Sequence, residues 1–171
     1  ISYQEKPKTW SYYLHIAIAP TKNNDRIEWF LEKATEIGID EITPIFCSNS
    51  ERRVVKLERF EKIIQSAMKQ SLKFTLPKLN DPVKFNEFIN QEIEGIKCIA
   101  HCEDDEKSLL KSKVNPSEKI TILIGPEGDF SLDEIKNALN NKFTPITLGE
   151  SRLRTETAAL VAVNIVSFIN Q

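Results

Sequence analysis

The chain has 171 residues, of which 40% are hydrophobic and 28% charged, with a formal net charge of −2. This composition is typical of a globular protein with one core, and it excludes a disordered or fibrous chain. The small negative net charge excludes a polycation that coats nucleic acid everywhere, but it allows a local basic patch. The longest apolar run, residues 158–163, is far shorter than the roughly 20 residues that span a bilayer.

Two features bear on the cellular context. No basic segment followed by an apolar one opens the chain, and its three cysteines are too few and odd in number for a disulfide-stapled secreted domain. We therefore expect a cytoplasmic protein with reduced cysteines. The first residue is Ile1 rather than Met, which suggests a fragment or a processed product.

Hydrophobic spacing predicts strands that alternate with helices along the chain. The expected strands cover residues 13–19, 39–47, 97–102, 119–124 and 144–148. The expected helices begin at a cap on Asn24 or Asp25, near Leu57, at Asp81-Pro82, at Leu132 and at Thr155. Gly38 is expected to end the first helix, and Ser131 with Glu134 predicts a capping box for the fourth. This alternation predicts an α/β domain with a largely parallel sheet.

The last expected helix, over residues 155–169, has apolar side chains almost all the way round. Such a helix needs cover on most sides, because a surface helix normally has one polar face. It is either buried centrally or packed against a second subunit. The second arrangement is favoured, since a domain of this size has little room for a fully buried helix.

Residues 122–130 join an apolar strand to a capped helix through a turn bracketed by Gly125 and Gly128. In parallel α/β sheets, ligands bind outside the carboxyl ends of strands, at turns of this kind. The two glycines let the backbone approach a ligand closely. The segment therefore indicates a ligand site, with a plain tight turn as the alternative, and it matches no P-loop or dinucleotide-binding motif.

Residues 147–158 repeat this layout, with a strand end, Gly149, a polar loop that holds Arg152 and Arg154, and a helix. Two adjacent strand ends with glycine loops predict one cleft with two walls. The alternative is that the arginines form structural salt bridges. The acidic candidates for such pairs are Glu127, Glu150 and Glu156.

The segment from Glu51 to Lys73 has a local net charge of +4, against −2 for the whole chain. A basic helix with its entry loop can follow a phosphate backbone, which makes this segment a candidate nucleic-acid surface. The alternative is an amphipathic helix whose charged face is merely solvated.

Two other chemistries fail on spacing. Cys98, His101 and Cys102 have no matched second pair of ligands, so we expect no zinc or other metal site. Residues 149–153 lack the closing glycine of a hydrolase nucleophile elbow.

Four motifs together resemble the RsmE family, SPOUT-class enzymes that methylate N3 of a uridine in small-subunit (16S) ribosomal RNA with S-adenosylmethionine. In chain order the motifs are residues 33–38, 125–128, 148–149 and 153–158. Ser50-Glu51-Arg52 and Gln70-Ser71 also lie where the family has similar residues. The resemblance covers the chain from Tyr13 onward.

The resemblance implies a SPOUT-type α/β knot: a mostly parallel sheet with helices on both faces and a trefoil knot in the C-terminal third. It implies a homodimer that pairs through the last helix. Family members also have a small N-terminal PUA-like β-barrel that helps to hold RNA. No segment of this sequence resembles that barrel, so residues 1–171 are expected to be the methyltransferase domain alone.

The resemblance also implies roles for particular residues. Arg154, then Arg52, would stabilise negative charge on the base, while Glu127 or Glu156 would accept the N3 proton or orient an arginine. The expected cofactor residues are Ala100, His101, Leu123, Ile124, Gly125, Pro126, Glu127, Gly128, Thr147, Leu148, Gly149, Ser151, Leu153, Arg154 and Thr155. The expected RNA-binding residues are Lys33, Arg52, Arg53, Lys56, Lys69, Gln70, Lys73 and Arg152.

The sequence departs from the family pattern at a few positions. Asp129 stands where the family usually has a second glycine, and Ser151-Arg152 stands where it usually has Arg-Ile. Two other functions remain open. One is a knotted methyltransferase that acts on another RNA, such as transfer RNA, and the other is a non-catalytic RNA-binding domain.

Overall fold

The computed structural model describes residues 7–171; residues 1–6, which the expected domain includes, lie outside the described residues. Eight strands form one sheet in the order β3-β2-β1-β7-β5-β8-β6, with β4 paired to β2, and every pairing is parallel. The strands are β1 Tyr13–Ile18, β2 Glu41–Phe46, β3 Lys78–Leu79, β4 Val83–Lys84, β5 Ile96–Ala100, β6 Ser108–Leu109, β7 Lys119–Ile124 and β8 Thr144–Thr147. The predicted α/β class with a largely parallel sheet is confirmed.

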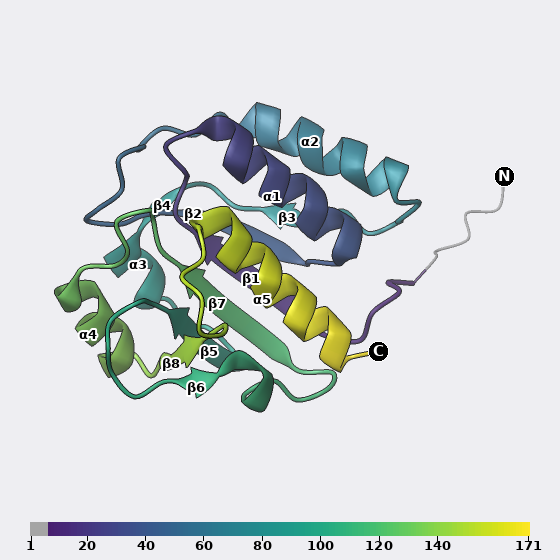
Figure 1. Ribbon diagram of the computed structural model, residues 1–171. Helices are drawn as coiled ribbons and strands as arrows, with labels where there is room; N and C mark the ends of the chain where they lie inside the picture. Colours follow the sequence, from purple (N-terminus) through teal and green to yellow (C-terminus); the bar gives the residue numbers. More distant parts are fainter. Residues whose placement is uncertain (1–6) are drawn as a thin grey trace, which may run out of the picture.

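Helices cover both faces of the sheet (Figure 1). One face carries α1, α2 and α5, and the other carries α3 and α4. The helices are α1 Asn24–Ile37, α2 Leu57–Gln70, α3 Phe85–Ile89, α4 Leu132–Asn140 and α5 Thr155–Ile169, with a 3-10 turn η1 at Leu110–Ser112. The central strands are apolar because they are buried on both faces, as expected for a parallel sheet. Within residues 7–171, no helix combines the length and the apolar character that a membrane crossing needs.

The order of the central strands makes the C-terminal third cross back over the sheet. The chain leaves β7, forms α4, and enters β8 on the far side of β5. It then returns through residues 148–154 to α5, which packs against α1 on the opposite face (Figure 1). The trefoil knot that the resemblance implies would form at this return, and its threading stays a prediction.

Most predicted elements are confirmed, and the differences have local causes. The capping box is present: Ser131 Oγ accepts a bond from Glu134 N, and Glu134 Oε2 accepts one from Ser131 N. The predicted N-cap of α1 at Asn24 or Asp25 is wrong. The cap is Asn23, whose side chain accepts a hydrogen bond from Asp25 N at 3.0 Å. The helix expected from Asp81 begins four residues later, since residues 83–84 form β4 beside β2.

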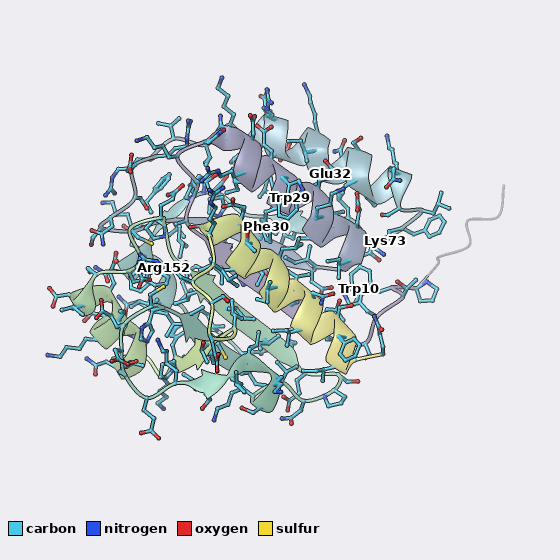
Figure 2. All side chains as sticks on the ribbon, in the orientation of Figure 1. Trp10, Trp29, Phe30, Glu32, Lys73 and Arg152 are labelled. Carbon is cyan, nitrogen blue, oxygen red and sulfur yellow. The ribbon has the colours of Figure 1, made fainter. Side chains whose placement is uncertain are left out.

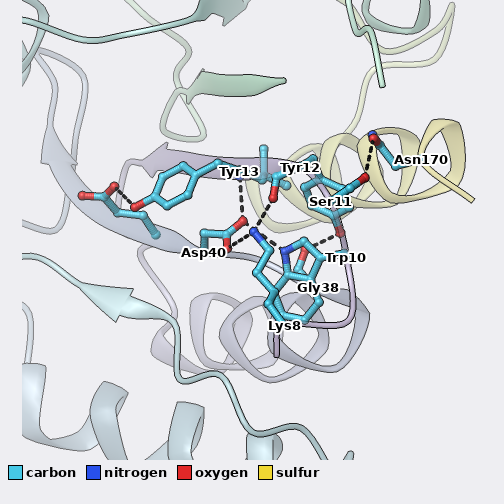
Figure 3. Close-up of polar contacts among 10 residues, drawn as sticks. Lys8, Trp10, Ser11, Tyr12, Tyr13, Gly38, Asp40 and Asn170 are labelled. Carbon is cyan, nitrogen blue, oxygen red and sulfur yellow. Dashed lines mark hydrogen bonds and ion pairs between the residues drawn. The ribbon is translucent and has the colours of Figure 1, made fainter. Parts of the chain in front are cut away.

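The segment before β1 is tied by hydrogen bonds to the amino end of the sheet (Figure 3). The buried Asp40 carboxylate accepts hydrogen bonds from Leu14 N at 2.8 Å, Trp10 Nε1 at 3.1 Å and Lys8 Nζ at 2.6 Å. The Tyr12 hydroxyl donates to the carbonyl of Gly38, which ends α1. These bonds hold the N-terminal segment against the turn between α1 and β2.

Candidate functional site

The carboxyl ends of β7, β5 and β8 lie next to one another in the sheet, and each strand runs directly into a loop. These loops and the start of α5 enclose two adjoining cavities of about 290 and 280 Å³. Both cavities are lined by Ala100, Cys102, Arg152, Leu153 and Ala158. The predicted cleft at the strand ends is therefore present, and Arg152 and Leu153 lie where its two halves meet.

Most of the residues expected to bind cofactor come together in this cleft. The first cavity is lined by Ala100, Ile124, Gly125, Pro126, Glu127, Leu153, Arg154 and Thr155. The second is lined by Ala100, His101, Thr147, Leu148, Gly149, Ser151 and Leu153. The loops selected from their glycines and arginines are thus the walls of one site.

Two expected cofactor residues lie outside the cleft. Leu123 is fully buried among side chains of the α3 and α4 face, because it points away from the cavities in the alternation of β7. Gly128 packs against Asn49, and a Cβ built on it would lie 3.2 Å from the Asn49 Cβ. Each is adjacent in sequence to a residue that does line the first cavity, Ile124 and Glu127 respectively.

The cleft also includes residues that were not among the expected cofactor-binding or RNA-binding residues. These are Cys102, Lys107, Asp129, Ile146, Glu150 and Ala158. The sequence could have predicted Ala158, since it lies one helical turn after Arg154 and faces the same way. Cys102 and Lys107 follow β5, where the sequence shows only a polar loop, and carried no comparable signal.

Thr155 joins the two walls of the cleft. Its buried hydroxyl donates to the Gly125 carbonyl at 2.9 Å, which links the start of α5 to the loop after β7. At the opposite wall, Thr147 Oγ1 donates to the Gly149 carbonyl at 2.8 Å. Gly149 has a φ of 141°, and a Cβ there would meet nothing within 4 Å, so its backbone faces open space. The cleft is therefore pre-formed, and it has free space beside Gly149 on one side.

Arg152 and Arg154 have no ion-pair partner among residues 7–171. Two of the candidate carboxylates are otherwise engaged. Glu127 Oε1 accepts from Lys22 N at 2.8 Å, and Glu156 Oε1 lies 3.8 Å from Arg26 Nε. The alternative of structural salt bridges is therefore wrong for these two arginines. Both are exposed on the loop before α5, where Figure 2 labels Arg152, and both line the first cavity.

Arg52 does not line either cavity. Its guanidinium donates twice to the Lys22 carbonyl, from Nε at 3.1 Å and from Nη2 at 2.8 Å. The Lys22 N–H in turn donates to Glu127. These bonds hold together the loops after β1, β2 and β7. Of the three expected catalytic residues, Arg154 and Glu127 thus line the cleft, whereas Arg52 is linked to Glu127 through Lys22.

The residues expected to bind RNA do not form one patch. Arg52, Arg53 and Lys56 precede α2 at the cleft end, whereas Lys69, Gln70 and Lys73 lie about 20 Å further along the helix. Lys73 Nζ sits 5.5 Å above the Trp10 ring, beside the N-terminal segment (Figure 2). On α1, Lys33 pairs with Glu32 and Glu36. Of the expected RNA-binding residues, only Arg152 lines the cleft.

His101 follows β5, and its side chain is buried. Neither ring nitrogen has a hydrogen-bond partner, and Nε2 lies 3.6 Å from the Asp105 carboxylate. Burial lowers the pKa of His101, so the imidazole is neutral at pH 7. Burial likewise raises the pKa of the neighbouring Cys102 thiol, which favours the unreactive thiol form.

A parallel sheet with a ligand cleft at its carboxyl ends defines a class of α/β binding domains. Comparison with known families makes this specific, since the RNA methyltransferase domain model matches residues 8–167. The chain is 35% identical over 153 residues to the ribosomal RNA small subunit methyltransferase E of Mesomycoplasma hyopneumoniae, which covers 86% of this chain. It is 30% identical over 165 residues to that of Aquifex aeolicus, covering 93% of this chain and 68% of that protein. The chain belongs to the RNA methyltransferase domain family, and within it to the ribosomal RNA small subunit methyltransferase E family.

Solved structures agree with this assignment. A probable rRNA-methyltransferase from Porphyromonas gingivalis superposes with a TM-score of 0.92 at 42% identity, covering 98% of this chain and 71% of that one. A ribosomal RNA small subunit methyltransferase E from Neisseria gonorrhoeae, bound to S-adenosyl methionine, has a TM-score of 0.81 at 29% identity, covering 92% and 66%. The chain spans 65% of the M. hyopneumoniae protein and 62% of its Buchnera aphidicola relative.

Proposed function

We propose that this chain is the methyltransferase domain of an enzyme that transfers a methyl group from S-adenosylmethionine to N3 of a uridine in small-subunit ribosomal RNA. The observation that carries the proposal is the pair of unpaired arginines, Arg152 and Arg154, in a cleft built by the family's motifs. Both guanidiniums are exposed at the first cavity and have no ion pair among residues 7–171, so they are free to bind a negatively charged group of a ligand.

The cleft fits the proposed cofactor in both of its halves. The second cavity combines apolar side chains of Ile146, Leu148 and Leu153 with the open backbone at Gly149, which suits an adenine ring and its ribose. The first cavity carries two carboxylates and the Arg152 guanidinium, which suits a zwitterionic amino-acid end. When bound, S-adenosylmethionine supplies an electrophilic methyl group.

Two residues in the first cavity would act on the base. Uridine N3 has a weakly acidic proton that must leave before N3 attacks, and negative charge then develops on the base oxygens. The Arg154 guanidinium would stabilise that charge, because it is permanently charged, lines the cavity and has no ion pair in the described part of the chain. Glu127 is the better placed proton acceptor, since it lines the cavity, whereas Glu156 is buried beside Arg26.

Arg52 would act as a positioning residue. It holds the Lys22 carbonyl, and the Lys22 N–H holds the Glu127 carboxylate, so it orients Glu127 through one residue of main chain. Together with Arg53, Lys56 and Arg152, it also contributes to a basic surface at the mouth of the cleft, where RNA phosphates would bind.

A second copy of the chain would cover α5. One side of this helix packs into the core of the chain with Ala159, Ala162, Val163 and Val166, whereas Phe168 is 71% exposed. Trp29 on α1 is 42% exposed. A homodimer that pairs through α5 would bury Phe168, and we expect Phe168→Asp to convert a dimer into a monomer in sedimentation velocity. A wild-type monomer at micromolar concentration would contradict this part.

Residues 1–171 are assigned to one methyltransferase domain, with the family's RNA-holding barrel outside these residues. A ribosomal RNA substrate places the protein in the cytoplasm, which agrees with three cysteines that are all free thiols.

Calorimetric titration with S-adenosylmethionine, with ATP as the control, tests the proposed function first. We expect saturable binding near one per chain and none for ATP. A methylation assay that compares small-subunit ribosomal RNA with transfer RNA then tests the substrate. A folded protein that binds no S-adenosylmethionine would refute the cofactor assignment, and transfer of methyl groups to transfer RNA alone would refute the substrate.

A further inference from the structure

Asp129 follows Gly128 in the loop after β7, at the position where the resemblance expects a glycine. Its φ of 62° lies in the left-handed region, which glycine adopts freely and which aspartate tolerates better than most residues. The loop therefore keeps a glycine-like conformation while it adds a carboxylate to the cleft, because Asp129 lines the first cavity.

The Asp129 side chain is fixed at the junction of two loops. Its Oδ2 accepts from Cys102 N after β5 at 2.8 Å, and its Oδ1 accepts from Phe130 N at 2.8 Å. Its main chain is held separately, since Asn49 Nδ2 donates to the carbonyls of Gly128 and Asp129 at 3.2 and 3.1 Å. The position of the carboxylate is thus set before any ligand enters.

Asp129 also sets the charge of the first cavity. With Glu127 it balances the charges of Arg152 and Arg154, and a glycine at residue 129 would leave this cavity with a net positive charge. A cavity without net charge admits a cationic ligand more readily than one with a positive net charge.

We propose that Asp129 is a specificity-determining residue that makes the cleft favour the sulfonium cofactor over its demethylated product. This inference rests on the proposed function. Transfer breaks the sulfur–methyl bond, and the sulfur keeps that electron pair and becomes neutral. The Asp129 carboxylate therefore attracts the methyl donor more than the product, S-adenosylhomocysteine, which favours exchange of product for fresh donor.

The test compares dissociation constants for S-adenosylmethionine and S-adenosylhomocysteine by calorimetry. The variants are Asp129→Asn and Asp129→Gly, which both tolerate the left-handed backbone, with Asp133→Asn as the matched control. Asp133→Asn removes one negative charge, as the Asp129 variants do. Because Asp133 is exposed on α4 and lies outside both cavities, this change leaves the charge of the cleft unaltered. Melting temperatures check that each variant folds.

We expect both Asp129 variants to weaken S-adenosylmethionine binding about tenfold relative to S-adenosylhomocysteine, which corresponds to about 1.4 kcal/mol. The control should leave the ratio of the two constants unchanged. An unchanged ratio in Asp129→Asn, or equal weakening of both ligands, would overturn the inference and leave Asp129 as a structural link. If the wild-type protein binds neither ligand, the proposed function fails and this inference with it.

Discussion

Two polar regions of this sheet differ in whether their charged groups have partners. At the carboxyl ends of the strands, Arg152 and Arg154 line a cleft without an ion pair in the described part of the chain. On β1 to β3, the Glu41 carboxylate accepts from the Tyr13 hydroxyl and from Asn80 Nδ2, each at 2.7 Å. In that region His15 Nε2 also lies 2.7 Å from Thr43 Oγ1.

This difference separates polar groups that stabilise the fold from those that await a ligand. A buried polar group costs free energy unless it is paired, so the saturated network around Glu41 belongs to the folded state itself. The cleft arginines are exposed, and they keep their bonding capacity for a substrate. We therefore expect substitutions in the cleft to reduce activity the most.

Arg154→Ala should have the largest effect, a fall in methyl transfer of about 10² to 10³-fold. Because Arg154 has no ion pair among residues 7–171, the melting temperature should not change, and the dissociation constant for S-adenosylmethionine should stay within about threefold. Single-turnover methylation and calorimetry measure the two quantities, with the exposed Lys136→Ala as control. Equal loss of binding and transfer would show that Arg154 holds the cofactor rather than the base.

The paired region should respond to pH. Burial lowers the pKa of His15 from 6.5 to about 4, so between these values the unfolded chain takes up a proton that the folded chain refuses. The free energy of unfolding should therefore fall as the pH falls from 6.5 to 4, by up to about 3 kcal/mol.

Urea unfolding of the wild type and of His15→Gln over this pH range measures that contribution. The variant lacks the titrating ring, so its stability should fall less steeply. His101, whose pKa burial also lowers, acts in the same direction in both proteins and cancels in the comparison. Parallel slopes for the two proteins would assign the acid sensitivity to other groups.

Thr155→Val should have an intermediate effect. It removes the hydroxyl that bonds the Gly125 carbonyl and leaves a buried acceptor unpaired, which costs about 1 to 2 kcal/mol of unfolding free energy. Binding of S-adenosylmethionine should also weaken, because this bond joins the two walls of the cleft. Thr155→Ser keeps the hydroxyl and serves as the control. If the valine variant binds cofactor as tightly as the wild type, the link does not shape the site.

The smallest effect is expected for Lys33→Ala. Lys33 is paired with Glu32 and Glu36 on the surface of α1, so its loss should change stability by less than about 0.5 kcal/mol and RNA affinity by less than about twofold. Lys56→Ala, at the cleft end of α2, should reduce the salt dependence of RNA binding by about one phosphate contact. A larger effect for Lys33 would place the RNA across α1 instead.

Local patterns in the sequence determined the elements and the loops that build the cleft. The apolar runs predicted β1, β7 and α5, the capping box predicted the start of α4, and Gly125 and Gly149 marked the two loops that meet. These signals are readable because they depend on the chemistry of neighbouring residues. The family resemblance then extended the reading from a ligand cleft to a methyltransferase.

Only the tertiary structure decided which groups face the cleft and which are already paired. Strand alternation turned Leu123 into the core, and packing turned Gly128 toward Asn49. The Lys22 N–H, in the loop after β1, donates to Glu127, and Arg26 on α1 lies beside Glu156. Within the described residues, Arg152 and Arg154 therefore have no ion pair. These contacts join residues far apart in the chain, and side chains of similar charge compete for them, so spacing along the sequence does not specify the outcome.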